Sequence, residues 1–108
     1  MVEKRLKGMT AFPGNVSGRA FILTDRDVIP KLKNGEILVA ECTYPAYLPV
    51  MLKAKAMVTE VGGILCHSAI VAREFKIPCV VGVDGLMDTV KDGDIITIKD
   101  GEIIVKKA

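Results

Sequence analysis

The strongest constraint on the fold comes from two apolar segments that flank a glycine pair and a helix-like run. Ala54–Glu60 and Cys79–Val83 are short, apolar and rich in β-branched residues, as expected of buried strands. Between them, Gly62-Gly63 predicts a tight turn, because only glycine adopts positive φ at little cost. Ser68–Lys76 then contains good helix formers and neither glycine nor proline. Strand, turn, helix and strand in this order predict a βαβ unit, whose crossover should be right-handed.

The rest of the chain supplies further strands around this unit. They are expected at Gly18–Leu23, Glu36–Cys42, Asp94–Ile98 and Glu102–Val105. The last two strands are joined at Asp100-Gly101, a dipeptide typical of tight hairpins. Pro45 predicts a short helix that runs to about Lys53, residues 11–16 predict a turn, residues 25–34 predict a loop or a short helical turn, and residues 1–7 either begin a strand or stay irregular.

Length and composition predict one compact domain over residues 1–108. A chain of 108 residues has the usual size of a single domain, and half of its residues are hydrophobic, which is enough to form a core. The order of the elements predicts an α/β fold with mixed sheets and one or two helices.

Charge and cysteine content argue against several classes of function. The net charge is +2 and the basic residues are scattered, so we expect no nucleic-acid surface. Cys42, Cys66 and Cys79 form no C-x-x-C pair, and a single histidine cannot complete an ordinary zinc cluster, so we expect no metal site and reduced thiols. No apolar run approaches the roughly 18 residues that a membrane span requires. We therefore expect a cytoplasmic protein without membrane contact.

His67 is the main candidate for chemistry. It stands just before the predicted helix, whose first N–H groups have no partner inside the helix and whose dipole favours an anion. A neutral imidazole nitrogen is nucleophilic near neutral pH, so this position suits a histidine that carries a phosphoryl group. A structural or merely exposed histidine is the alternative. Cys66 is not expected to form a nucleophilic pair with His67, because neighbouring residues at a turn usually point apart.

The run GGILCHSAIVARE from Gly62 to Glu74, followed by IPCVVG, resembles the phosphohistidine signature of the phosphoenolpyruvate-utilising enzymes. That family includes phosphoenolpyruvate synthase, pyruvate phosphate dikinase and enzyme I of the sugar phosphotransferase system. The resemblance is to their mobile, swivelling domain, extends over almost the whole chain, and implies a β/β/α layered fold. One position departs from the pattern: Leu65 stands where the family usually has threonine, so a hydroxyl that could touch or regulate the phosphoryl group is missing.

The resemblance also implies roles for particular residues. His67 would carry the phosphoryl group, on the ring nitrogen farther from the main chain, although the sequence alone leaves the nitrogen open. Gly62 and Gly63 would shape the turn, Ser68 and the helix N-terminus would hold the phosphate oxygens, and Arg73 would assist.

For Ser68 and Arg73, the residues themselves allow a second interpretation. Ser68 is a natural helix N-cap. Arg73 lies six residues beyond His67 and is expected on roughly the same side of the helix. An ion pair in the neighbourhood of Glu74 or with Glu60 is an equal alternative.

Two functions remain open. In the first, the chain is a stand-alone carrier that takes a phosphoryl group from phosphoenolpyruvate or ATP at one partner site and passes it on at another. The chain contains no glycine-rich nucleotide loop followed by lysine. ATP and Mg²⁺ are therefore expected on an ATP-grasp partner subunit, phosphoenolpyruvate or pyruvate on another, and no cofactor on this domain. In the second, which Leu65 favours, the chain is a non-catalytic binding or regulatory module that keeps the swivelling fold.

Overall fold

The computed structural model describes residues 3–23, 36–43, 47–63 and 65–107. These residues form eight strands and three short helices. In chain order the elements are β1 (Glu3–Lys7), β2 (Met9–Phe12), β3 (Val16–Leu23), β4 (Ile37–Ala40), α1 (Leu48–Met51), β5 (Ala56–Thr59), α2 (His67–Phe75), β6 (Cys79–Val81), α3 (Leu86–Thr89), β7 (Ile95–Lys99) and β8 (Glu102–Lys106). The strand order is β1-β8-β7-β3-β4-β5-β6-β2.

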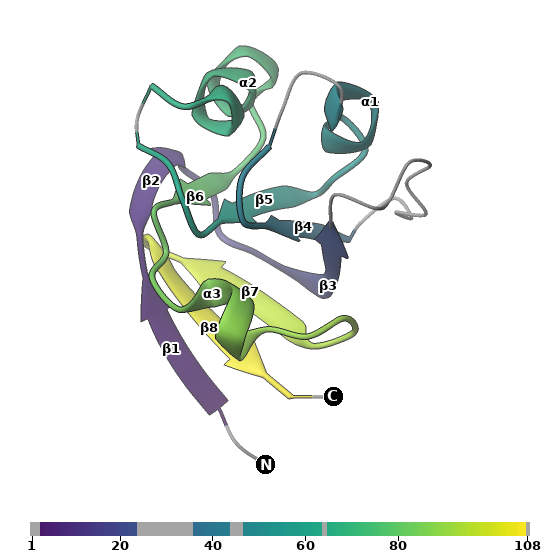
Figure 1. Ribbon diagram of the computed structural model, residues 1–108, viewed down its shortest axis with the longest axis vertical. Coiled ribbons are helices and arrows are strands. Elements are labelled where there is room, and N and C mark those ends of the chain that lie inside the picture. Colours follow the sequence, from purple (N-terminus) through teal and green to yellow (C-terminus); the bar gives the residue numbers. More distant parts are fainter. Residues whose placement is uncertain (1–2, 24–35, 44–46, 64, 108) are drawn as a thin grey trace.

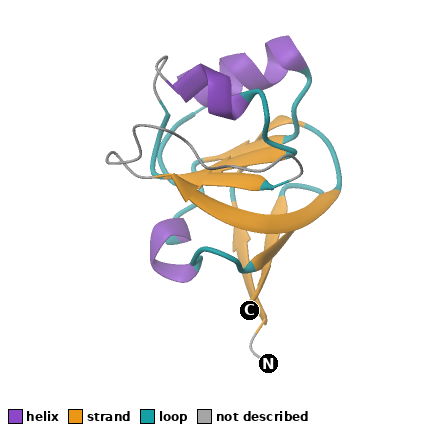
Figure 2. Ribbon diagram, turned by 90° about the vertical axis from the view of Figure 1, so that its right-hand side faces the viewer, coloured by secondary structure: helices purple, strands orange, loops and turns teal. Residues whose placement is uncertain are grey.

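Strand β3 joins two parts of this sheet. Its first residues, Val16–Arg19, pair antiparallel with β7, and its last residues, Ala20–Leu23, pair parallel with β4. On one side of β3 lie the antiparallel strands β7, β8 and β1, and on the other lie the parallel strands β4, β5 and β6 with β2 at their edge. The two parts pack against each other, and α1 and α2 cover the outer face of the parallel part (Figures 1 and 2).

The two ends of the sheet are consecutive in sequence, since only Gly8 separates β1 from β2. The sheet therefore curves almost into a barrel. The chain passes so close to β6 at this point that a Cβ on Gly8 would lie 2.5 Å from Val83 Cγ2 and 2.7 Å from the Val81 carbonyl oxygen. Glycine is required here by close backbone approach.

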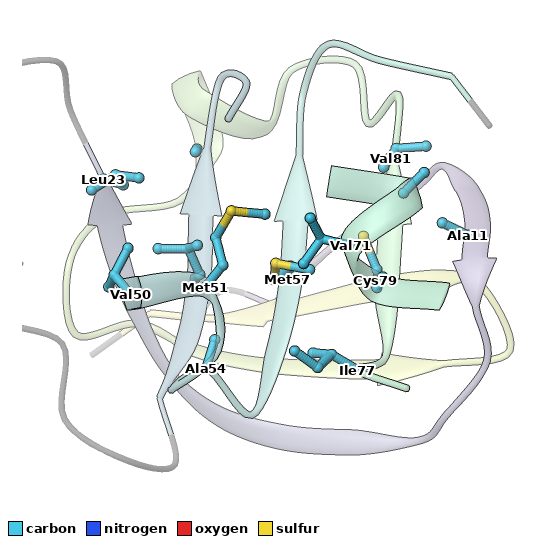
Figure 3. Close-up of a cluster of buried hydrophobic side chains, with 14 residues drawn as sticks. Ala11, Leu23, Val50, Met51, Ala54, Met57, Val71, Ile77, Cys79 and Val81 are labelled. Atoms are coloured by element: carbon cyan, nitrogen blue, oxygen red, sulfur yellow. The ribbon is translucent and has the colours of Figure 1, made fainter. Parts of the chain in front are cut away.

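Alternation along the parallel strands divides the core into two clusters. In β4, Ile37 and Val39 face the antiparallel part, whereas Leu38 and Ala40 face the helices, because successive strand residues point to opposite faces. The cluster under the helices includes Met51, Met57, Val71 and Cys79 (Figure 3). The cluster between the sheets includes Val58, Ile96, Ile103 and Val105. Two sheet layers and one helical layer confirm the β/β/α arrangement.

The α/β fold with mixed pairing is confirmed, and some local expectations need correction. Three helices are present among the described residues instead of one or two, because α3 has only four residues and is too short to show a helical period. Residues 11 and 12, which we expected in a turn, belong to β2, where pairing with β6 extends the strand up to Pro13-Gly14. The predicted loop at 25–34 and the start of the helix at Pro45 lie outside the described residues.

The predicted hairpin is confirmed. Asp100 and Gly101 both have positive φ, 52° and 80°, which is the backbone of a turn that matches the twist of paired strands.

Candidate functional site

The site forms where the parallel strands β4 and β5 end side by side. Their hydrogen bonding continues past the strands: the Glu60 amide donates to the Ala40 carbonyl at 3.1 Å, and the Val61 amide donates to the Glu41 carbonyl at 2.9 Å. Carboxyl ends of parallel strands meet at one edge of a sheet, which is where open α/β folds bind their ligands. The segment after β4 and the glycine turn after β5 are thereby brought together.

Gly62 and Gly63 have different parts in the turn. Gly62 has φ 135°, and a Cβ on it would lie 2.8 Å from the Cys66 sulfur, so both its conformation and its surroundings require glycine. Gly63 has nothing within 4 Å of its Cβ position. Its carbonyl accepts a hydrogen bond from the Cys66 amide at 3.0 Å, which closes the turn.

Helix α2 begins at His67, and Cys66 is its N-cap residue, in an extended conformation with φ −73° and ψ 165°. The expectation that Ser68 caps the helix is therefore wrong. The Cys66 sulfur packs under Gly62, and the helix therefore begins at His67, one residue before the serine. The Cys66 carbonyl accepts a hydrogen bond from the Ile70 amide at 3.0 Å. The Cys66 side chain makes no capping hydrogen bond to the first N–H groups of α2.

Ser68 is buried within the first turn, only 2% exposed, and its hydroxyl lies 3.3 Å from the Cys66 sulfur. Burial raises the pKa of the neighbouring Cys79 thiol to about 12, and the Cys66 thiol adds to this, while the Ser68 hydroxyl and the Arg73 guanidinium oppose it. The serine hydroxyl thus lies among thiols as well as beside the site.

The half-buried His67 ring is held by Thr43, a residue that the sequence did not single out. The Thr43 hydroxyl lies 3.3 Å from His67 Nδ1, and the threonine itself is 7% exposed. This hydrogen bond orients the imidazole and engages the nitrogen nearer the main chain. The only sequence signal for Thr43 is its place just after β4, at the edge where His67 was expected.

A small open pocket of about 110 Å³ lies beside the imidazole. Its lining residues are Cys42, Thr43, Val61, Gly62, Cys66, His67 and Ser68. None of these seven residues has a carboxylate, ammonium or guanidinium group. The pocket therefore brings together three of the residues predicted from the sequence, namely His67, Gly62 and Ser68.

Arg73 does not line this pocket. It is exposed and lies in the last turn of α2, whereas His67 lies in the first. Six residues correspond to about 9 Å along a helix and about 240° around it, so the expectation that both side chains share one side is wrong. A role for Arg73 in phosphate binding stays a prediction.

Within the described ranges, no three His, Cys, Asp or Glu side chains are arranged to hold a metal ion. None of the helices in that same part of the chain is long and apolar enough to cross a membrane.

Comparison with known proteins gives one family and a set of enzymes. The family model "PEP-utilising enzyme, mobile domain" matches residues 32–103. Phosphoenolpyruvate synthase from Pyrococcus furiosus is 45% identical over 91 residues, which are 84% of this chain and 11% of the synthase. The chain spans only 11–14% of the length of the phosphoenolpyruvate synthases that it matches.

Two solved structures have a similar fold. A solution structure of Enzyme I has a TM-score of 0.59 at 30% identity, with 69% of this chain and 32% of that chain covered. Aconitase X from Thermococcus kodakaraensis has a TM-score of 0.74 and covers 96% of this chain and 99% of its own, but at 22% identity this likeness shows the fold alone.

Proposed function

Because this chain belongs to the family of mobile domains of phosphoenolpyruvate-utilising enzymes, we propose that it carries a phosphoryl group on His67 between two partner sites. The observation that carries the proposal is the placement of the imidazole. It is half-buried at the first residue of α2, lies beside a small pocket, and is held at Nδ1 by the Thr43 hydroxyl.

This placement suits a nucleophile that must accept a phosphoryl group and later release it. In the tautomer in which Nδ1–H donates to the Thr43 hydroxyl oxygen, Nε2 has a free lone pair and is the nitrogen that attacks. Its lone pair forms the N–P bond while the P–O bond to the leaving group, a nucleoside phosphate or the enolate of pyruvate, breaks. Phosphoryl transfer depends mainly on positioning and charge stabilisation, and the uncapped N–H groups of α2 supply part of the latter.

The remaining parts of the reaction belong to other polypeptide segments in this proposal. ATP and Mg²⁺ bind an ATP-grasp partner, phosphoenolpyruvate or pyruvate binds a second partner, and all of them meet in the cytoplasm. The comparison with much longer synthases supports this division, because this chain corresponds to 11% of the Pyrococcus furiosus enzyme. This domain itself binds no cofactor.

The second candidate is a binding or regulatory module that keeps the fold without transfer. Leu65 in place of the usual threonine favours it, as does the position of Arg73 outside the pocket lining. In this case His67 would be dispensable.

The test uses a clarified extract of the cells that express the chain, supplied with labelled phosphoenolpyruvate or with ATP labelled in its β and γ phosphates. We expect one phosphoryl group per chain by intact mass, with the acid-labile and base-stable behaviour of phosphohistidine. His67→Ala should abolish the label, whereas the control Thr97→Val, in the antiparallel part, should keep it. Label that persists on His67→Ala would rule out the carrier function.

A further inference from the structure

Another pocket, which shares no lining residue with the one beside His67, lies where the curved sheet closes. Strand β2 ends the sheet order and meets the tip of the β7–β8 hairpin, where a Cβ on Gly101 would lie 2.9 Å from Thr10 Oγ1 (Figure 1). The pocket between them has a volume of about 310 Å³. Its lining residues are Thr10, Phe12, Pro13, Gly14, Asn15, Val80, Ile98, Asp100 and Gly101. Small-molecule sites are frequent in the mouths of barrels, and this volume lies within their usual range.

The walls of this pocket are fixed by the fold. The register of β2 against β6 shifts between Thr10 and Phe12, which is a bulge of the kind that reorients side chains at sheet edges. On the opposite wall, Asn15 Oδ1 accepts a hydrogen bond from the Asp100 amide at 3.2 Å. Because Gly101 has no side chain, the space beside the Thr10 hydroxyl stays open. The pocket is therefore formed before a ligand arrives, which lowers the cost of binding.

The lining combines an apolar floor with one negative charge. Val80 and Ile98 are buried beneath the pocket, and Phe12 adds an aromatic side chain. Of the lining residues, only Asp100 is charged near neutral pH, and its exposed carboxylate makes no hydrogen bond or ion pair within the described ranges. The Thr10 hydroxyl is a further hydrogen-bond acceptor. Carboxylates and aromatic rings both attract organic cations.

An adjoining surface hollow of about 260 Å³ leaves this charge unbalanced. It shares Thr10, Asp100 and Gly101 with the pocket and adds Lys7 and Glu102, one charge of each sign. These two residues lie directly opposite each other in β1 and β8, where opposite charges compensate. The net charge around the pocket is therefore that of Asp100.

We propose that this pocket binds a small organic ammonium compound. The cation lies at the Asp100 carboxylate and the Thr10 hydroxyl, and the apolar body of the ligand lies over Phe12 and Ile98. The site is separate from the residues around His67, so this inference does not depend on the carrier function proposed above.

The test is a ¹H–¹⁵N NMR titration of the purified chain with benzylammonium chloride. Benzyl alcohol and benzoate serve as neutral and anionic compounds of nearly the same shape. Benzylammonium should shift the amides of Thr10, Asp100 and Gly101 and saturate with a Kd of about 1–10 mM, as expected of so small a ligand. Benzyl alcohol should bind at least about threefold more weakly, and benzoate should not bind. Raising NaCl from about 0.05 to 0.5 M should weaken only the binding of benzylammonium.

The charge is tested by Asp100→Asn, because asparagine also adopts the positive φ of 52° found at this turn position. This variant should bind benzylammonium and benzyl alcohol equally and lose the salt dependence. The matched control is Asp84→Asn, since Asp84 is also exposed but lies outside the pocket, and it should keep the wild-type Kd. Thr10→Val should raise the Kd for benzylammonium about 2- to 10-fold, the equivalent of one net hydrogen bond.

Three outcomes would overturn the proposal. The first is equal binding of the three compounds to the wild type, and the second is the absence of saturation by benzylammonium below about 50 mM. The third is an Asp100→Asn variant that still prefers benzylammonium to benzyl alcohol. If Asp100→Asn does not fold, Thr10→Val and the salt series decide in its place. None of these outcomes bears on the phosphorylation of His67.

Discussion

The helix-covered parallel part and the antiparallel part of the sheet bury their strands in different ways. Every residue of β4, β5 and β6 is buried, because helices cover one face and the other sheet layer covers the second. Strands β7 and β8 alternate between buried and more exposed residues along their length. In the parallel part, only the ends of the strands reach solvent, and the candidate site lies at such an end. When both faces of a sheet are covered, polar functional groups can reach solvent only at the ends of its strands.

The largest effect should come from removing a core side chain from each part. Ile103→Ala between the sheets and Met57→Ala under the helices both remove fully buried side chains, so each should lower the free energy of unfolding by about 2–5 kcal/mol. Chemical denaturation measures the loss. Below its unfolding transition, Ile103→Ala should still be phosphorylated at the wild-type rate. A cost below about 1 kcal/mol for Ile103→Ala would show that the antiparallel part packs more loosely than its burial indicates.

A pair of glycine substitutions should separate stability from function. Gly62→Ala and Gly93→Ala both introduce a side chain at positive φ, 135° and 89°, which costs about 1–3 kcal/mol. At Gly62 the new methyl would also lie 2.8 Å from the Cys66 sulfur, whereas at Gly93 the nearest atom is Arg19 Nη2 at 3.7 Å. Displacing Cys66 moves the start of α2, so we expect the initial phosphorylation rate to fall at least about tenfold for Gly62→Ala only. Equal rates for both variants would contradict the proposed part of Gly62.

The buried thiol of the parallel part should make stability depend on alkaline pH. Because the pKa of Cys79 is raised from 9.0 to about 12 in the folded chain, the unfolded chain loses this proton first as the pH rises. The contribution of this thiol to the free energy of unfolding is unchanged below about pH 9 and falls by on the order of 2 kcal/mol by pH 10.5. The denaturation midpoint should therefore decrease more between pH 8 and pH 10.5 in the wild type than in Cys79→Ala. Equal pH dependence in both proteins would argue against the raised pKa.

The smallest effects should come from two threonine hydroxyls, one in each part. Thr43→Val removes the hydrogen bond to His67 Nδ1 and should slow phosphorylation about 2- to 10-fold, the equivalent of one net hydrogen bond. The ¹⁵N chemical shifts of the imidazole should report a changed tautomer. The control Thr97→Val removes an exposed hydroxyl that lies 3.0 Å from the Ser17 hydroxyl in the antiparallel part, and it should leave phosphorylation unchanged. If Thr43→Val leaves the tautomer and the phosphorylation rate unchanged, Thr43 has no role in orienting His67.

Local sequence signals predicted much of this architecture. The apolar runs on both sides of Gly62-Gly63 and the Asp100-Gly101 turn correspond to β5, α2, β6 and the β7–β8 hairpin. These elements are specified by residues close together in sequence, which is why period and turn chemistry suffice.

The parts that could not be predicted depend on contacts between distant segments. Thr43 reaches His67 across 24 positions, and only the register of β4 against β5 brings them together. The helix begins at His67 instead of after Ser68 because the Cys66 sulfur fills the space under Gly62, a packing effect without a sequence signature. The proposed roles of the site residues remain predictions.

The pairing of β1 with β8 has a mechanical consequence. Glu3 lies opposite Lys106, so the first and last strands start and finish at one corner, at the far end of the 36 Å long axis from α2 (Figure 1). A neighbouring domain joined to either strand would therefore be attached at this one corner. In the proposed carrier function, rotation about that corner would move the imidazole over a distance comparable with the 36 Å long axis of the domain.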